Sequence, residues 1–261
     1  MTNHLINPML ADGALQFAFE KATTEGKATI IVLFALSMLS WTIIIRKFRQ
    51  LYIARKWAKQ FFAAYNTTHD PLDIHRKGQT FDGAPAYQLY IRGADELAYQ
   101  LQKNPVTVKG ERRISRASFD AVKVVLEEAA STEAMTLEKG MIVLSTAVAG
   151  GPFIGLLGTV WGVMETFAGI ARASSASLTA MAPGVAGALI ATVTGLLVAI
   201  PAMFAYNFMV TSIRHITQEL DNFAARYATQ IEHGYVDNRD IEDKIAMALT
   251  RGEQGEVVPA I

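Results

Sequence analysis

Three long stretches of the chain carry no charged residue and consist mostly of apolar side chains. They cover positions 28–45, 140–164 and 173–213. A helix needs about 20 apolar residues, and at least roughly 17, to cross the hydrocarbon core of a bilayer. Each stretch is long enough, and the charged segments between and after them have helical patterns of their own. The expected fold is therefore an all-α membrane protein with three transmembrane helices and long cytoplasmic helical extensions.

The charges that flank the apolar stretches determine the expected topology. Six basic residues and no acidic one follow the first stretch, over positions 46–59. Basic residues near the ends of membrane helices remain in the cytoplasm, so we expect a periplasmic N-terminus and a cytoplasmic C-terminus. The expected segments are a periplasmic N-terminal segment 1–27, transmembrane helices 28–45, 140–171 and 182–212, a cytoplasmic helical insertion 46–139, a periplasmic turn 172–181, and a cytoplasmic helix and tail 213–261.

Residues that break helices divide the segments outside the apolar stretches. We predict one helix over 87–102, which the pair Asn104-Pro105 ends. A long helix is predicted to begin near Lys109 and to continue without a break into the second transmembrane helix. The other predicted helices cover 14–21, where a frayed terminus is an alternative, 51–62, 213–233 and 240–249.

Small residues recur four positions apart in the second and third apolar stretches, which is typical of closely packed membrane helices. The second stretch contains two such pairs, Gly151 with Gly155 and Gly158 with Gly162. The third carries two small-residue stripes, which predict neighbours on two sides and hence a homo-oligomer. Pro183 suits the first turn of a helix, where a missing N–H is tolerated, and Pro201 is a candidate kink. The stripes consist of Gly184, Ala188 and Thr192, and of Gly187, Ala191, Gly195 and Ala199.

Few side chains in these stretches can interact with an ion. Thr159 and Thr192 either bond to a carbonyl of their own helix or face each other across a pore, and spacing alone leaves both interpretations open. Glu165 is an ionisable group inside an expected membrane helix, which is costly and therefore indicates a functional site. The alternative is that Glu165 lies near the outer interface and reaches water. We treat these three residues as candidates for an ion pathway.

The composition argues against several other functions. The formal net charge is zero, which gives no support to a nucleic-acid partner, and the absence of cysteine excludes disulfides and thiolate chemistry. The chain contains no motif of a serine hydrolase, a zinc protease or a phosphate-binding loop. We therefore expect a protein surrounded by membrane lipids that is not an enzyme and that needs no cofactor or metal.

Two segments resemble the ExbB/TolQ branch of the MotA/TolQ/ExbB proton-channel family. They are GPFIGLLGTVWGVMETF at 151–167 and APGVAGALIATVTGLLVAIPAMFAYN at 182–207. The resemblance implies a homopentamer in the bacterial inner membrane around two copies of an ExbD/TolR-like protein, whose single span carries a protonatable Asp. It implies that proton flow moves this partner and thereby energises a TonB- or TolA-like protein. It also implies that Thr159 and Thr192 line the proton path.

One position departs from the family pattern. Relatives commonly have a Glu in the third helix where this chain has Gly187, and Glu165 stands where they often have Asn or His. The rise of a helix puts both positions at nearly the same expected depth, so we hypothesise that the carboxylate has moved from the third helix to the second. The departure leaves three alternatives open. The chain could be a stator-like paralogue that drives a different machine, it could couple to sodium in place of protons, or it could be a scaffold that conducts no ion.

Overall fold

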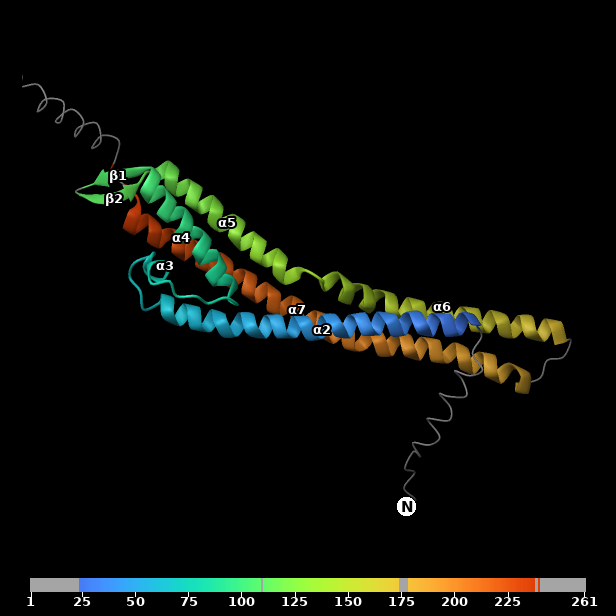
Figure 1. Ribbon diagram of the computed structural model, residues 1–261. Coiled ribbons are helices and arrows are strands. Elements are labelled where there is room, and N and C mark those ends of the chain that lie inside the picture. The colour runs from blue at the N-terminus through green and yellow to red at the C-terminus, as the bar shows by residue number, and fades with distance from the viewer. Residues whose placement is uncertain (1–23, 109, 174–177, 238, 240–261) are drawn as a thin grey trace, which may run out of the picture. The chain divides into compact units, whose positions relative to one another are not determined.

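The protein is described by a computed structural model, which covers residues 24–108, 110–173, 178–237 and 239 and is mostly helical (Figure 1). The helices predicted over 14–21 and 240–249 lie outside these residues. The elements are α2 (Thr24–Tyr65), α3 (Asp73–Arg76), α4 (Pro85–Lys103), β1 (Pro105–Val108), β2 (Glu111–Ile114), α5 (Arg116–Glu138), α6 (Met141–Ala173) and α7 (Leu178–Tyr235).

Contacts within the chain divide it into two compact units. The first combines residues up to Tyr52 with Thr136–His215, and the second combines Ile53–Met135 with the residues from Ile216 onward. Helices α2 and α7 contribute to both units. The first unit therefore contains the three apolar stretches, and the second contains the charged segments between and after them.

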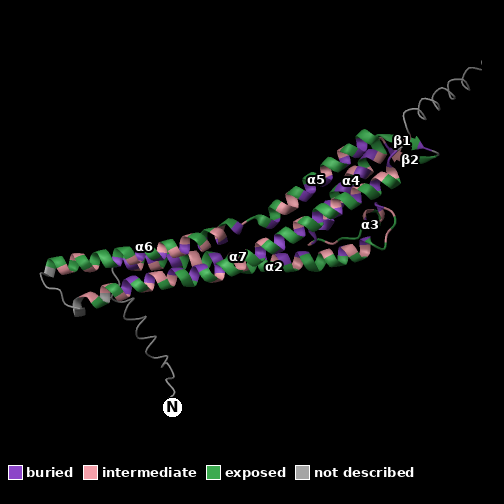
Figure 2. Ribbon diagram, turned by 180° about the vertical axis from the view of Figure 1, so that it is seen from behind, coloured by how far each residue is buried: buried purple, intermediate pink, exposed green. Residues whose placement is uncertain are grey.

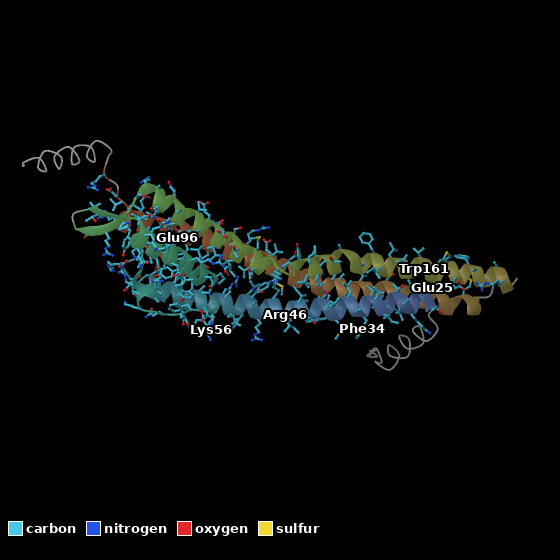
Figure 3. All side chains as sticks on the ribbon, turned by 45° about the horizontal axis from the view of Figure 1, so that its top comes forward. Glu25, Phe34, Arg46, Lys56, Glu96 and Trp161 are labelled. Atoms are coloured by element: carbon cyan, nitrogen blue, oxygen red, sulfur yellow. The ribbon has the colours of Figure 1, made fainter. Side chains whose placement is uncertain are left out.

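Three helices are long and apolar enough to cross a membrane, as the sequence predicted. They are α2, the part of α6 over Met141–Arg172 and the part of α7 over Gly184–Tyr235. Many large apolar side chains of the first unit are exposed, and Figure 2 shows this surface along the three helices; Phe34 and Trp161 are two examples labelled in Figure 3. Because so large an apolar surface is unfavourable in water, the first unit is suited to a membrane.

The predicted helix after Lys109 begins later than expected. Residues Pro105–Val108 and Glu111–Ile114 pair as antiparallel strands, Gly110 between them has a φ of 85°, and α5 begins only at Arg116. The β-branched residues of PVTV favour a strand, and glycine adopts a positive φ without steric cost. The all-α prediction therefore fails at this hairpin, although most of the described chain is helical.

α5 and α6 are two helices, in contrast to the single continuous helix that was predicted. α5 ends at Glu138 and α6 begins at Met141, with Gly140 between them at a φ of 89°. A residue in the left-handed region ends an α-helix, and glycine is favoured there. The Lys47 ammonium of α2 donates a hydrogen bond to the Leu137 carbonyl at 2.8 Å, which satisfies one of the carbonyls left unpaired at the end of α5.

α6 and α7 both extend into the predicted periplasmic turn 172–181. α6 ends at Ala173 and α7 begins at Leu178, because the sequence LTAMA at 178–182 is rich in good helix formers. Pro183 therefore lies inside α7 and not in its first turn as predicted, and its missing N–H removes one backbone hydrogen bond. Pro201 also lies inside α7, which continues beyond it.

The core of the second unit is a cluster of aromatic rings. Phe223 and Tyr227, on the predicted apolar face of α7, are fully buried. The ring of Phe61 from α2 lies 5.4 Å from that of Phe223, and the ring of Tyr90 from α4 lies 5.1 Å from that of Tyr227. These contacts confirm the predicted apolar face of α7 after position 213, and the predicted helix over 87–102 is confirmed as α4.

A polar contact joins the segment after α2 to the end of α7 within the second unit. The Asp70 carboxylate accepts hydrogen bonds from the Leu72 N–H at 2.9 Å and from the Tyr235 hydroxyl at 2.7 Å, and it pairs with Arg76. Burial by itself would raise the pKa of Asp70, but these donors outweigh it and hold the pKa below its ordinary value. The carboxylate is therefore charged at neutral pH.

Candidate functional site

Glycines allow α6 and α7 to touch along their length within one chain. A Cβ added at Gly155 would lie 2.9 Å from the Ala191 carbonyl oxygen, and one added at Gly195 would lie 2.5 Å from the Gly151 carbonyl oxygen. Both distances are shorter than a van der Waals contact, and the neighbouring atoms belong to the backbone. No larger residue fits at these two positions unless the helices separate. We call this contact the α6–α7 seam.

Both small-residue stripes of α7 face α6 at this seam. Gly184 lies against the Thr166 side chain, and Ala188 lies against Gly162. The second stripe, which includes Ala191, makes the contacts described above. One neighbour in the same chain thus contacts residues of both stripes, so the stripes by themselves do not require a second subunit.

A third helix reaches the seam at Thr29 of α2, a residue that the sequence analysis missed. A Cβ added at Gly158 would lie 2.6 Å from the Ala191 Cβ and 3.1 Å from the Thr29 Cγ2. The Thr29 hydroxyl donates to the Glu25 carbonyl at 2.9 Å in its own helix, which leaves its methyl group at the junction. Nothing in the sequence distinguishes Thr29 from the other hydroxyl residues of the first stretch, because its role depends on the packing of three helices.

Thr159 of α6 and Thr192 of α7 are in direct contact at the seam. Their Oγ1 atoms lie 2.5 Å apart, and the Gly155 carbonyl oxygen lies 3.1 Å from the Thr159 Oγ1 and 3.3 Å from the Thr192 Oγ1. Thr159 thus reaches a carbonyl of its own helix, Thr192 reaches a carbonyl of the neighbouring helix, and the two hydroxyls also reach each other. That they line a pore stays a prediction. Both side chains are half-buried, so the pair is open to one side of the two helices.

The surface around the threonine pair is apolar. Positions three before and four after a residue share its face of a helix. The four residues at these positions relative to Thr159 and Thr192 are all exposed: Leu156, Val163, Leu189 and Leu196. The threonine pair is therefore a polar point on an apolar strip along α6 and α7.

Two other threonines of the same helices use their hydroxyls locally. Thr166 donates to the Gly162 carbonyl at 2.7 Å, and Thr194 donates to the Ile190 carbonyl at 2.8 Å. Each acceptor lies one turn back in the same helix, which is the usual arrangement for a threonine in a helix. The contact between Thr159 and Thr192 is thus not a general property of threonines in this part of the chain.

Glu165 does not join the threonine pair. Its Oε1 accepts a hydrogen bond from the Arg172 Nη2 at 2.9 Å, and the two side chains are 49% and 71% exposed. A helix turns by about 100° per residue, so Glu165 lies about 120° around α6 from Thr159. The carboxylate therefore faces another side of the helix.

Gly187, the position at which the third-helix carboxylate was expected, is buried in α7. Gly162 lies against Ala188, so Glu165, three residues further along α6, is within about one helical turn of Gly187 in depth. The two positions therefore lie at a similar depth, while the role of the Glu165 carboxylate stays a prediction.

The seam offers oxygen atoms that can exchange hydrogen bonds. A threonine hydroxyl donates one hydrogen bond and accepts two, so the pair can bond to a protonated or an ionised carboxyl group that approaches from its open side. Among the residues that the structure describes, no group of His, Asp or Glu is arranged to hold a metal ion. The seam can therefore exchange hydrogen bonds with a polar or charged group.

The sequence is similar to proteins of known families. The model of the MotA/TolQ/ExbB proton channel family matches residues 96–222, which include α6 and the threonine pair. The Tol-Pal system protein TolQ of Haemophilus influenzae is 34% identical over 217 residues, which are 81% of this chain and 90% of that protein. The biopolymer transport protein ExbB of Xanthomonas campestris pv. campestris is 32% identical over 220 residues, which are 80% of this chain and 86% of that protein.

Proposed function

Because the chain belongs to the MotA/TolQ/ExbB proton channel family, we propose that it is the pore-forming subunit of a motor driven by the proton-motive force in the bacterial inner membrane. It is a membrane protein of the ExbB/TolQ type, and its family consists of transport components and not of enzymes. The observation that carries the proposal is the contact between Thr159 and Thr192, whose hydroxyls lie 2.5 Å apart on an apolar strip.

The proposed assembly is a homopentamer around two copies of an ExbD/TolR-like protein with one span. The apolar strip around the threonine pair supports this arrangement, because its exposed leucines and valine suit contact with apolar helices. In this proposal the N-terminus is periplasmic, the C-terminus is cytoplasmic, and the helices in the membrane lie within 28–45, 140–171 and 182–212. Five seams would then surround the partner's spans and present hydroxyl groups to its Asp.

The proposed output is mechanical. Moving one elementary charge through 100 mV supplies ~2.3 kcal/mol, so a few protons per cycle supply enough free energy to rearrange packed helices. The threonine hydroxyls bond to the partner's Asp in its charged or neutral form, and each proton that binds or leaves changes that contact. The resulting motion of the partner would energise a TonB- or TolA-like protein that serves outer-membrane transport or integrity.

Ion flux into liposomes tests the proposed function. We expect proton flux when this chain and its one-span partner are reconstituted together, and no flux above background with either protein alone. A parallel experiment with a sodium gradient tests the choice of ion. A stable complex that conducts neither ion would contradict the proposal and would favour a non-conducting scaffold.

We also propose that Glu165 makes a subunit or partner contact that a third-helix carboxylate makes in relatives. Its exposed position on α6, in an ion pair with Arg172, leaves the carboxylate accessible to a second chain. We expect Glu165→Gln to reduce energy-coupled function several-fold, and the double variant with Gly187→Glu to recover part of the loss. Arg172→Gln is the control for the ion pair itself. Full function of Glu165→Gln in a growth assay would contradict this role.

A further inference from the structure

One face of α2 stays exposed along the first unit and changes from apolar to basic. Its apolar part consists of large side chains, three or four residues apart and each more than half exposed, namely Phe34, Met38, Trp41, Ile45 and Phe48. Tyr52, which is 66% exposed, continues this face. Arg49 lies beside it, and Arg46 lies on the same edge one turn earlier; both are exposed. Phe34 and Arg46 mark the two parts of α2 in Figure 3.

The apolar part of this face has nearly the length of a hydrocarbon core. The helix rises by about 26 Å from Ile31, which is also exposed, to Phe48, and the core of a bilayer is about 30 Å thick. Arg49 and Tyr52 therefore lie at the level of the lipid headgroups, and the long side chain of Arg46 reaches the same level. Tyrosine suits this level because its ring is apolar and its hydroxyl is polar.

Two aromatic rings form an exposed platform at the same level. The ring of Phe48 from α2 stacks on the ring of Phe208 from α7, with 5.7 Å between the ring centroids and an angle of 21° between the planes. The two side chains are 54% and 50% exposed, so the stack keeps an open side. We call this pair the aromatic stack. Its exposed ring surface is suited to contact with the part of an acyl chain nearest the headgroup.

The two arginines beside the aromatic stack have no counterion in the described part of the chain. No described residue forms a hydrogen bond or an ion pair with Arg46 or Arg49, and the nearest acidic residues in the sequence are Glu25 and Asp70. Lys47, which lies between the arginines, is buried and bonds to the end of α5. Two unpaired cations next to exposed aromatic rings suit a ligand that is anionic at one end and apolar at the other.

We propose that Arg46, Arg49 and the aromatic stack bind an anionic phospholipid, which in the proposed topology belongs to the cytoplasmic leaflet. The guanidinium groups bond to the lipid phosphate, for which arginine has a suitable planar set of donors. The Tyr52 hydroxyl donates to the headgroup, and the aromatic stack contacts the acyl chains. A zwitterionic lipid binds less tightly because its own cation meets the two arginines. The proposal depends on the membrane placement of α2 and not on the ion pathway.

Lipid titration of the full chain, followed by native mass spectrometry, tests the site. We expect phosphatidylglycerol to bind at least tenfold more tightly than phosphatidylcholine, because each basic residue near a membrane surface adds roughly fivefold. The double variant Arg46→Gln with Arg49→Gln should lose this preference. The control variant Lys139→Gln with Arg214→Gln removes two exposed charges next to the other two apolar helices and should keep it. An equal loss in the control, or no preference in the wild type, would overturn the proposal.

A second variant separates a built site from diffuse attraction to a charged surface. Phe48→Ala with Phe208→Ala keeps every charge but removes the aromatic stack, and we expect it to weaken the binding of phosphatidylglycerol at least threefold. Unchanged affinity would show that only surface charge attracts the lipid, which contradicts the proposal. Glycerol 3-phosphate, which has the phosphate but no acyl chain, should not displace the lipid at equal concentration. Displacement would identify the ligand as a free phosphate compound and not a lipid.

Discussion

Replacement of Thr192 by valine is expected to reduce partner-dependent proton flux by at least about tenfold, which corresponds to about 1.4 kcal/mol in the barrier. Valine has nearly the shape of threonine but no hydroxyl, so it removes the oxygen that lies 2.5 Å from the Thr159 Oγ1. The Thr159 hydroxyl then keeps the Gly155 carbonyl and loses its partner on α7. The measurement is proton flux into liposomes that contain the chain and its one-span partner, with Thr159→Val as the matching variant on α6.

Thr194→Val is the control for this experiment. It makes the same chemical change two residues further along α7, but the Thr194 hydroxyl bonds only to the Ile190 carbonyl of its own helix among the contacts described. Proton flux should stay within about twofold of the wild type, because a hydrogen bond from a threonine hydroxyl to a carbonyl one turn back contributes little to the stability of a helix. Normal flux in both Thr192→Val and Thr159→Val would exclude the seam from the ion path, and an equal loss in Thr194→Val would indicate a general effect on the helix.

Gly155→Ala is expected to destabilise the folded protein by about 1–3 kcal/mol and to lower flux with it. The added methyl group would lie 2.9 Å from the Ala191 carbonyl oxygen and 3.1 Å from the Thr192 Cα, both backbone atoms. The helices have to separate to admit it, and this separation draws Thr192 away from Thr159. Thermal unfolding in detergent measures the stability, and the liposome assay measures the flux.

Gly169→Ala is the matched control on the same helix. A Cβ at Gly169 meets no heavy atom within 4 Å, and alanine favours a helix over glycine by up to about 1 kcal/mol. We therefore expect this variant to be as stable as the wild type or slightly more so. If Gly155→Ala unfolds at the same temperature as Gly169→Ala, the seam tolerates a wider spacing than the structure indicates.

The apolar helices were predictable because their evidence is local. A long run of residues without charge identifies a membrane helix, regardless of which other helices it packs against. The hairpin at Pro105–Ile114 was missed, although the β-branched residues and Gly110 were local evidence for a strand and a turn. The break at Gly140 was also missed, although a glycine after Lys139 at the end of a helical pattern is a common way to terminate a helix.

The candidate site was predictable in its residue types and not in its contacts. The sequence identified Thr159 and Thr192, but their contact depends on the register between two antiparallel helices, which glycine positions such as Gly155 determine only once the helices are packed. The same limit applies to Lys47. In the sequence, Lys47 is one member of a basic cluster. In the structure it is only 6% exposed, and its ammonium bonds to the end of α5.

Three oxygen atoms at the seam share two hydroxyl hydrogens. One threonine can point its hydrogen at the Gly155 carbonyl while the other points its hydrogen at the first threonine, and either threonine can take either role. The two orders differ only by rotation about two C–O bonds, so no heavy atom has to move when they interchange. The two hydroxyl groups thus form a small dipole that can point in either of two opposite directions. Such rotations take picoseconds to nanoseconds, so the dipole can reorient toward a charge that comes close to it much faster than the helices around it can move.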